Sequence, residues 1–79
     1  MRIDKYLKIS RLIKRRSVAN EACDAGRVSV NGKIVKASYD VSVGDIIEIK
    51  LGERLLKVQV KDIAEHVLKT DASNLYTIL

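Results

Sequence analysis

The chain has 79 residues and a formal net charge of +5, with 15 lysines and arginines against 10 aspartates and glutamates. A chain of this length forms one domain that buries about 60–65 % of its unfolded surface, which leaves no room for a substrate cleft between two domains. No stretch approaches the roughly 18 apolar residues of a membrane span, and the start is too charged for a signal peptide. We therefore expect a cytoplasmic protein with no membrane partner.

The excess positive charge lies in the first 36 residues, which hold ten basic and three acidic side chains, net +7. The other 43 residues hold five basic and seven acidic side chains, net −2. A solvated lysine-rich surface would spread its charge evenly along the chain. Concentration of the charge in one segment instead predicts a surface that binds a polyanion.

The first expected element is an amphipathic helix over residues 2–13. Its apolar side would carry Ile3, Tyr6, Leu7, Ile9 and Ile13, and its basic side Lys5, Lys8 and Arg11. Leu12 falls on the basic side, so either it packs against a neighbouring element or the helix has ended before it.

A second, short helix is expected over residues 18–25. Ser17 is a good N-cap residue, and Gly26 is placed to take the left-handed conformation that often follows a last helical turn. This helix would have only about two turns.

After Gly26 the pattern changes from helical to alternating, which predicts strands. Residues 27–30 and 33–35 flank Asn31-Gly32, the strongest short signal of a β-hairpin turn. A turn over residues 41–45 would lead into a strand over residues 46–51.

The rest of the chain has a weaker pattern. A turn at Gly52-Glu53 leads into a strand on which Leu56, Val58 and Val60 alternate. Thr70 or Asp71 would cap a last short helix carrying Leu75 and Ile78. We therefore expect an α+β fold, with two N-terminal helices packed on a small antiparallel sheet. One domain would span residues 1–62, and a partly helical tail residues 63–79.

Residues for catalysis are scarce. The single histidine, His66, has no Cys or Ser partner nearby in the sequence, which favours an ordinary surface side chain. The single cysteine, Cys23, lies in an apolar helical pattern, so we expect a packed thiol rather than a nucleophile. With no paired carboxylates at metal spacing and no glycine-rich phosphate loop, we expect no enzyme, no metal and no cofactor.

Binding of an anion has more support. Arg15 and Arg16 come just before the second helix, whose free amides and dipole favour a negative charge, and Arg11 and Lys14 precede them. Arginine suits bidentate contact with phosphate. Arg27 and Lys33 would flank the same surface.

The aromatic content distinguishes between possible nucleic-acid ligands. The chain has three tyrosines and no Phe or Trp, and Tyr6 is expected in the core. Proteins that bind single strands usually offer several aromatic side chains for base stacking, and those that read the DNA major groove usually use a longer helix. These features favour structured RNA, bound through its backbone and shape.

Several segments together resemble the S4-type RNA-binding domain. They are the opening Met-Arg-Ile-Asp-Lys-Tyr-Leu, Ser10-Arg11, residues 14–17 with Ala19, the stretch from Gly26 to Gly32, and Val43-Gly44-Asp45. The match covers about the first fifty residues, and the combination is specific although each motif alone is weak. In its brevity the chain is similar to the short Gram-positive proteins of ribosome-associated quality control, which are related to bacterial heat-shock protein fifteen.

This resemblance implies a protein, expected to be a monomer, that binds the obstructed large (50S) ribosomal subunit. It would contact large-subunit rRNA and peptidyl-tRNA, and hold that tRNA while a NEMF-type factor adds a C-terminal alanine tail. Carried over by position, the RNA-contacting residues would be Arg2, Lys5, Lys8, Arg11, Lys14, Arg15, Arg16, Asn20, Arg27 and Lys33. Asp4 would order the first helix or pair with a cation.

The chain departs from the resembled family in one respect, and two alternative functions are open. The heat-shock relatives carry a longer basic C-terminal extension, whereas the last 43 residues here are net −2. The same cationic surface would also serve a ribosome assembly factor, or an RNA-binding accessory subunit of a modification enzyme.

Overall fold

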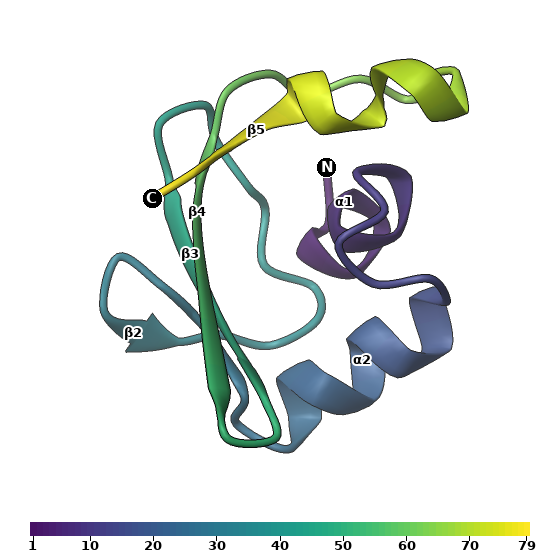
Figure 1. Ribbon diagram of the computed structural model, residues 1–79. Helices are drawn as coiled ribbons and strands as arrows, with labels where there is room; N and C mark the ends of the chain where they lie inside the picture. The colour runs from purple at the N-terminus through teal and green to yellow at the C-terminus, as the bar shows by residue number, and fades with distance from the viewer.

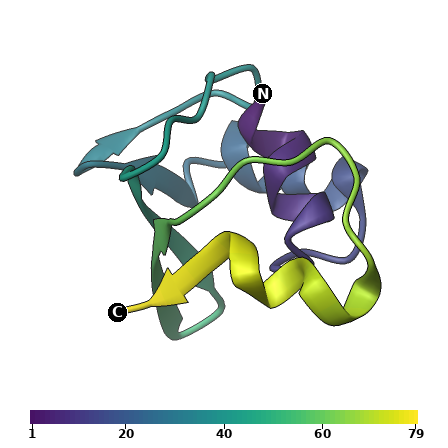
Figure 2. The ribbon, with the colours of Figure 1, turned by 90° about the horizontal axis from the view of Figure 1, so that it is seen from above.

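The computed structural model describes all residues from Met1 to Leu79. Two helices, α1 (Ile3–Ile9) and α2 (Arg16–Asp24), pack on one face of a five-stranded antiparallel sheet (Figures 1 and 2). The strands lie in the order β2-β1-β3-β4-β5. Their bounds are β1 Val28–Val30, β2 Lys33–Ile34, β3 Ile46–Leu51, β4 Arg54–Val60 and β5 Tyr76–Ile78, and a 3-10 helix, η1 (Lys69–Leu75), precedes β5. The expected α+β class is confirmed.

Helix α1 is shorter than the sequence predicts, because it ends at Ile9 rather than near residue 13. Ser10 caps it, and Arg11 then takes a left-handed conformation with φ of 62°. The Arg11 amide donates to Lys8 O at 3.1 Å, which satisfies one of the last helical carbonyls. Ile13 is nevertheless buried, so the apolar pattern beyond Ile9 belongs to a turn packed on the core.

Helix α2 starts earlier than predicted, and Ser17 is not its N-cap. The helix begins at Arg16, and its N-cap is Arg15, which makes no side-chain capping hydrogen bond. Ser17 therefore lies inside the first turn. Gly26 has φ of 73°, so the prediction of a left-handed residue after the helix is confirmed.

The two hairpins have their turns where the sequence predicts them. Asn31 and Gly32 both have positive φ, 51° and 85°, as a tight hairpin turn between β1 and β2 requires. Strand β3 has the predicted bounds, and Gly52-Glu53 joins it to β4. The inward side chains of β1, β3 and β4 meet the helices in one buried core, which includes Ile47, Val58 and Val60.

The C-terminal segment differs from the prediction. Neither Thr70 nor Asp71 caps a helix, because η1 begins after Leu68 without a side-chain cap. Leu75 closes η1, whereas Ile78 lies in β5 and pairs with Val58 of β4. A strand of three residues is too short to show an alternating pattern, which explains why the sequence did not reveal it.

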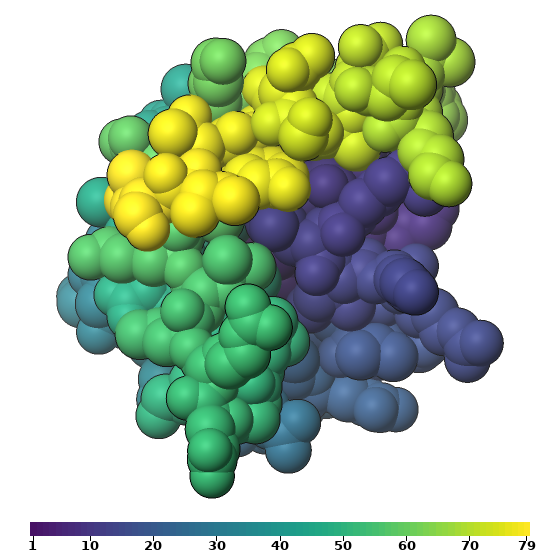
Figure 3. Space-filling view, in the orientation of Figure 1, coloured from purple at the N-terminus to yellow at the C-terminus, as the bar shows by residue number.

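Tyr6 joins this segment to the helices. Its ring is fully buried, as expected, and its hydroxyl donates to Leu75 O at 2.7 Å. The same carbonyl accepts the amides of Lys61 at 2.8 Å and Asp62 at 3.1 Å. Figure 3 shows the resulting contact, with the yellow C-terminal segment lying against the purple α1.

Cys23 is buried in the core with no disulfide partner, and desolvation raises the pKa of its thiol to about 11. The prediction of a packed thiol is therefore confirmed. Measured against the length and apolarity of a membrane-crossing segment, each helix of the fold falls short.

The substitution Tyr6→Phe tests the bond between helix α1 and the C-terminal segment. Loss of a buried hydrogen bond is expected to lower the free energy of unfolding by about 0.5–1.5 kcal/mol, measured by urea denaturation. Tyr76→Phe is the matched control, because the half-buried Tyr76 hydroxyl makes no hydrogen bond. Equal unfolding midpoints for the two variants would contradict this role of Tyr6.

Candidate nucleic-acid interface

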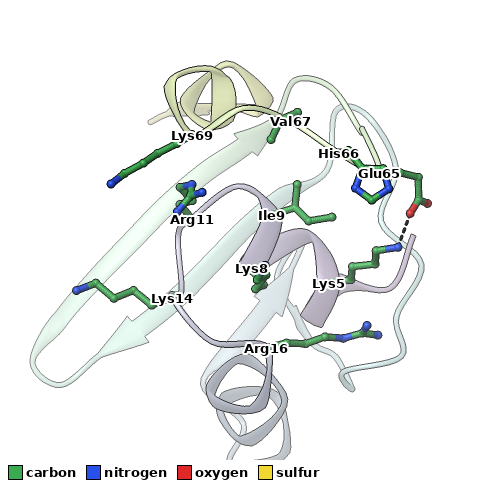
Figure 4. Close-up of a pocket in the computed structure, with 10 residues that line it drawn as sticks. All are labelled: Lys5, Lys8, Ile9, Arg11, Lys14, Arg16, Glu65, His66, Val67 and Lys69. Atoms are coloured by element: carbon green, nitrogen blue, oxygen red, sulfur yellow. Dashed lines mark hydrogen bonds and ion pairs between the residues drawn. The ribbon is translucent and has the colours of Figure 1, made fainter.

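Helix α1, the turn after it and the segment before η1 surround an open hollow of about 720 Å³ (Figure 4). Six cationic side chains line it, together with one histidine and a single carboxylate. Two apolar side chains, Ile9 and Val67, lie between them. The charged and ionisable residues are Lys5, Lys8, Arg11, Lys14, Arg16, Lys69, His66 and Glu65.

The local structure explains why these cations gather. Lys5 and Lys8 are three residues apart on α1, so they share one face of the helix. The left-handed conformation of Arg11 turns the chain back, and Arg11 and Lys14 then lie along the rim of the same hollow (Figure 4). Arg16, the first residue of α2, completes the lower side.

Asp4 holds the two helices and their cations together. Its carboxylate is only 2 % exposed and accepts hydrogen bonds from Arg2 (both at 3.2 Å), Arg16 (3.3 Å), Asn20 (3.4 Å) and the Lys5 amide (2.8 Å). The expectation that Asp4 pairs with neighbouring cations is therefore confirmed. Arg2 and Arg16 remain about half exposed, at 51 % and 47 %, so each is anchored at Asp4 and still open to solvent.

The surroundings of Asp4 also set its pKa. Burial alone would raise it, but the hydrogen bonds from Arg16, Arg2, Asn20 and the Lys5 amide together outweigh burial. The pKa of Asp4 is therefore held below its ordinary value of 3.8. Asp4 is thus charged at neutral pH, and it neutralises part of the repulsion between the two arginines.

The structure does not bring all the predicted residues into one place. Arg15 is exposed at the start of α2 but lies outside the hollow. Arg27 borders a separate, more apolar hollow between α2 and the β3–β4 turn. Lys33 is exposed on β2, at the edge of the sheet farthest in strand order from β5.

Four lining residues, Glu65, His66, Val67 and Lys69, come from a part of the chain that the sequence analysis did not predict to bind RNA. In Figure 4 His66 lies beside Glu65 and Lys5 and Lys69 lies beside Arg11, and Glu65 forms an ion pair with Lys5. Because residues 37–79 have a net negative charge, Lys69 did not stand out in the sequence as an RNA-binding candidate. No group of three His, Cys, Asp or Glu side chains is placed to hold a metal ion.

Known proteins match the whole chain. Residues 1–47 match the family described as S4 domain. All 79 residues align with the RQC P-site tRNA stabilizing factor of Bacillus subtilis (strain 168) at 51 % identity, covering 92 % of that protein. The factor of the same name from Streptococcus pneumoniae is 49 % identical, again over the whole chain and 90 % of its own length.

A similar solved structure is that of Vibrio cholerae heat shock protein 15, which is described as trimeric. It superposes with a TM-score of 0.92 at 29 % identity, covering 100 % of this chain and 81 % of the other. The chain is thus similar in fold to this protein and similar in sequence to the tRNA stabilizing factors.

Replacing the buried carboxylate in Asp4→Asn tests its role in the fold. At neutral pH we expect a loss of about 1–3 kcal/mol in the free energy of unfolding, because hydrogen bonds to a charged group are lost. A lowered folded-state pKa stabilises the protein above the unfolded value, and this stabilisation is lost as the pH falls through the folded value. The difference between wild type and variant should therefore be constant above about pH 5 and shrink below about pH 4.

Asp24→Asn is the control for this measurement, because Asp24 is exposed on α2 and makes no side-chain hydrogen bond or ion pair. Urea denaturation at several pH values gives the comparison. A difference between wild type and Asp4→Asn that does not vary with pH would contradict the role of the Asp4 charge.

Proposed function

Because the chain belongs to the S4 domain family and, over its whole length, to the family of RQC P-site tRNA stabilizing factors, we propose that it acts in ribosome-associated quality control. It binds the large ribosomal subunit that is obstructed by peptidyl-tRNA, and it stabilises that tRNA. The observation that carries this proposal is the 51 % identity over all 79 residues to a factor of that name.

The geometry supports RNA as the ligand. Six cationic side chains around one open hollow match the charge of a phosphate backbone. Beside them, the first amides of α2 point out of the helix with no partner within it, since the first intrahelical donor is the Ala19 amide. Such a surface positions a folded RNA through its backbone, without reading base edges.

We propose that the ten predicted residues form the RNA-contacting surface in two groups. Those in or beside the hollow would carry most of the binding energy, and Arg15, Arg27 and Lys33 would contact more distant phosphates. The protein would act as a binding factor rather than an enzyme, in the cytoplasm, and alongside a NEMF-type factor. We also propose that the protein acts as a monomer, whereas the similar Vibrio cholerae protein is described as trimeric.

Purification of the tagged protein from growing cells tests the proposed function. The bound RNA would be sequenced and the bound proteins identified by mass spectrometry. We expect large-subunit RNA, tRNA and a NEMF-type factor, with little small-subunit RNA. Immature subunits without tRNA would indicate ribosome assembly, and a modification enzyme without ribosomes would indicate an accessory subunit; either result would overturn the proposal.

Substitution of Arg16 tests the binding surface. Arg16→Ala should weaken binding to tRNA-obstructed large subunits by about 1–3 kcal/mol, or about 5- to 150-fold in Kd, if the contact is a charge-assisted hydrogen bond. The dependence of log K on log salt, about −4 to −5 for six neutralised phosphates, should become less steep by about one. Circular dichroism would confirm that the variant is folded.

Lys61→Ala is the control for Arg16→Ala, because it removes the same charge from an exposed site just after β4, outside the hollow. We expect almost no change in its affinity. Equal losses for the two variants would mean that net charge, and not a defined surface, binds the RNA.

A further inference from the structure

We propose that residues 65–69 form a second wall of the RNA-binding groove. In this wall Lys69 and His66 contact phosphates, and Glu65 stays paired with Lys5 until RNA displaces it. This inference rests on the proposed function and extends it to a segment outside residues 1–47, the part that matches the S4 domain family. The RNA backbone would then lie between α1 and the C-terminal segment rather than on α1 alone.

The position of this segment is fixed by the core. Ile63, Ala64 and Val67 pack against the buried cluster, and Leu75 is bonded through its carbonyl to Tyr6 of α1. The Asp71 amide donates to Leu68 O at 2.9 Å, which fixes the start of η1 next to Lys69. Lys69 is therefore presented to the hollow by a packed element and not by a free tail.

Lys69 adds a further positive charge to the hollow. In Figure 4 the Lys69 side chain extends beside Arg11 on one side of the hollow, and His66 lies beside Glu65 and Lys5 on the other. Three like charges, from Lys69, Arg11 and Lys14, share one rim with no carboxylate among the lining residues there. A hollow lined by cations from α1, the turn after it, α2 and η1, with the apolar Ile9 and Val67 between them, fits a phosphate backbone.

Glu65 has a different role, because it is the one carboxylate among the lining residues. Its exposed carboxylate accepts a hydrogen bond from Lys5 of α1, with which it forms an ion pair. The hydrogen bond from Lys5 is the main reason that the pKa of Glu65 lies below its ordinary value. A carboxylate on a lysine imitates a phosphate, so RNA that reaches Lys5 must displace Glu65 first.

Two substitutions with opposite expected effects test the proposal, with affinity measured on purified large subunits that carry peptidyl-tRNA. Lys69→Ala should raise the Kd about 5- to 10-fold and make the salt dependence less steep by about one, because one phosphate contact is lost. Lys69→Arg should restore affinity. Glu65→Gln should lower the Kd about 3- to 10-fold, because Lys5 no longer has an internal partner.

Each variant has a control with the same change in charge. Lys61→Ala matches Lys69→Ala, and Glu53→Gln, in the exposed turn between β3 and β4, matches Glu65→Gln. Both controls should change the Kd less than twofold. Thermal denaturation should show that all variants keep the wild-type fold, since every substituted side chain is exposed.

The proposal is overturned if Lys69→Ala binds like Lys61→Ala, or if Glu65→Gln binds no more tightly than Glu53→Gln. Arg16→Ala, measured in the same series, separates this result from a failure of the proposed function. If Arg16→Ala weakens binding while Lys69→Ala and Glu65→Gln bind like their controls, RNA binds to α1 and α2 alone. If Arg16→Ala also has no effect, the cationic hollow is not the RNA-binding surface.

Discussion

The carboxylate of Asp4 makes the cationic surface of this protein possible. It is almost fully buried, and it accepts hydrogen bonds from side chains of Arg2, Arg16 and Asn20, which belong to the start of α1 and to α2. A segment with net charge +7 would otherwise repel itself when its helices pack. Because one anion inside the fold offsets two cations at its surface, the helices can approach closely while their arginines still face solvent.

The remaining cations of the hollow depend on how α1 ends. Arg11 adopts a backbone conformation that costs a residue with a side chain about 1 kcal/mol, and glycine would normally be expected there. An arginine at this position is explained by its charge, since the turn places it on the rim of the hollow. The left-handed backbone of Arg11 is therefore strained locally, and it places a cation on the rim of the hollow.

Much of this fold was readable from the sequence, and the errors have physical causes. Asn31-Gly32 and the apolar run of β3 are strong local signals, and the structure follows both. The end of α1 was misplaced because Ile13 continues the helical pattern although a turn carries it into the core. Strand β5 was missed because its place is set by pairing with β4 and not by its own three residues.

The candidate site was only partly predictable for a similar reason. The cations of α1 and α2 are neighbours in the sequence, so their charge stands out. Lys69 and His66 join them because the C-terminal segment packs on the core and is bonded to Tyr6, and local composition does not reveal these long-range contacts. Arg27 and Lys33 belong to the same cationic part of the sequence, residues 1–36, yet the turn of the chain after α2 takes them away from the hollow.

The Leu75 carbonyl, with its three donors, also constrains the order in which the protein is made and folded. One donor, Tyr6, is separated from it by 69 residues, and the other two follow β4 directly. Closing so long a loop costs entropy that only the complete sheet and core repay. The positively charged N-terminal segment therefore leaves the ribosome first but cannot settle into its final arrangement until residue 75 has also emerged.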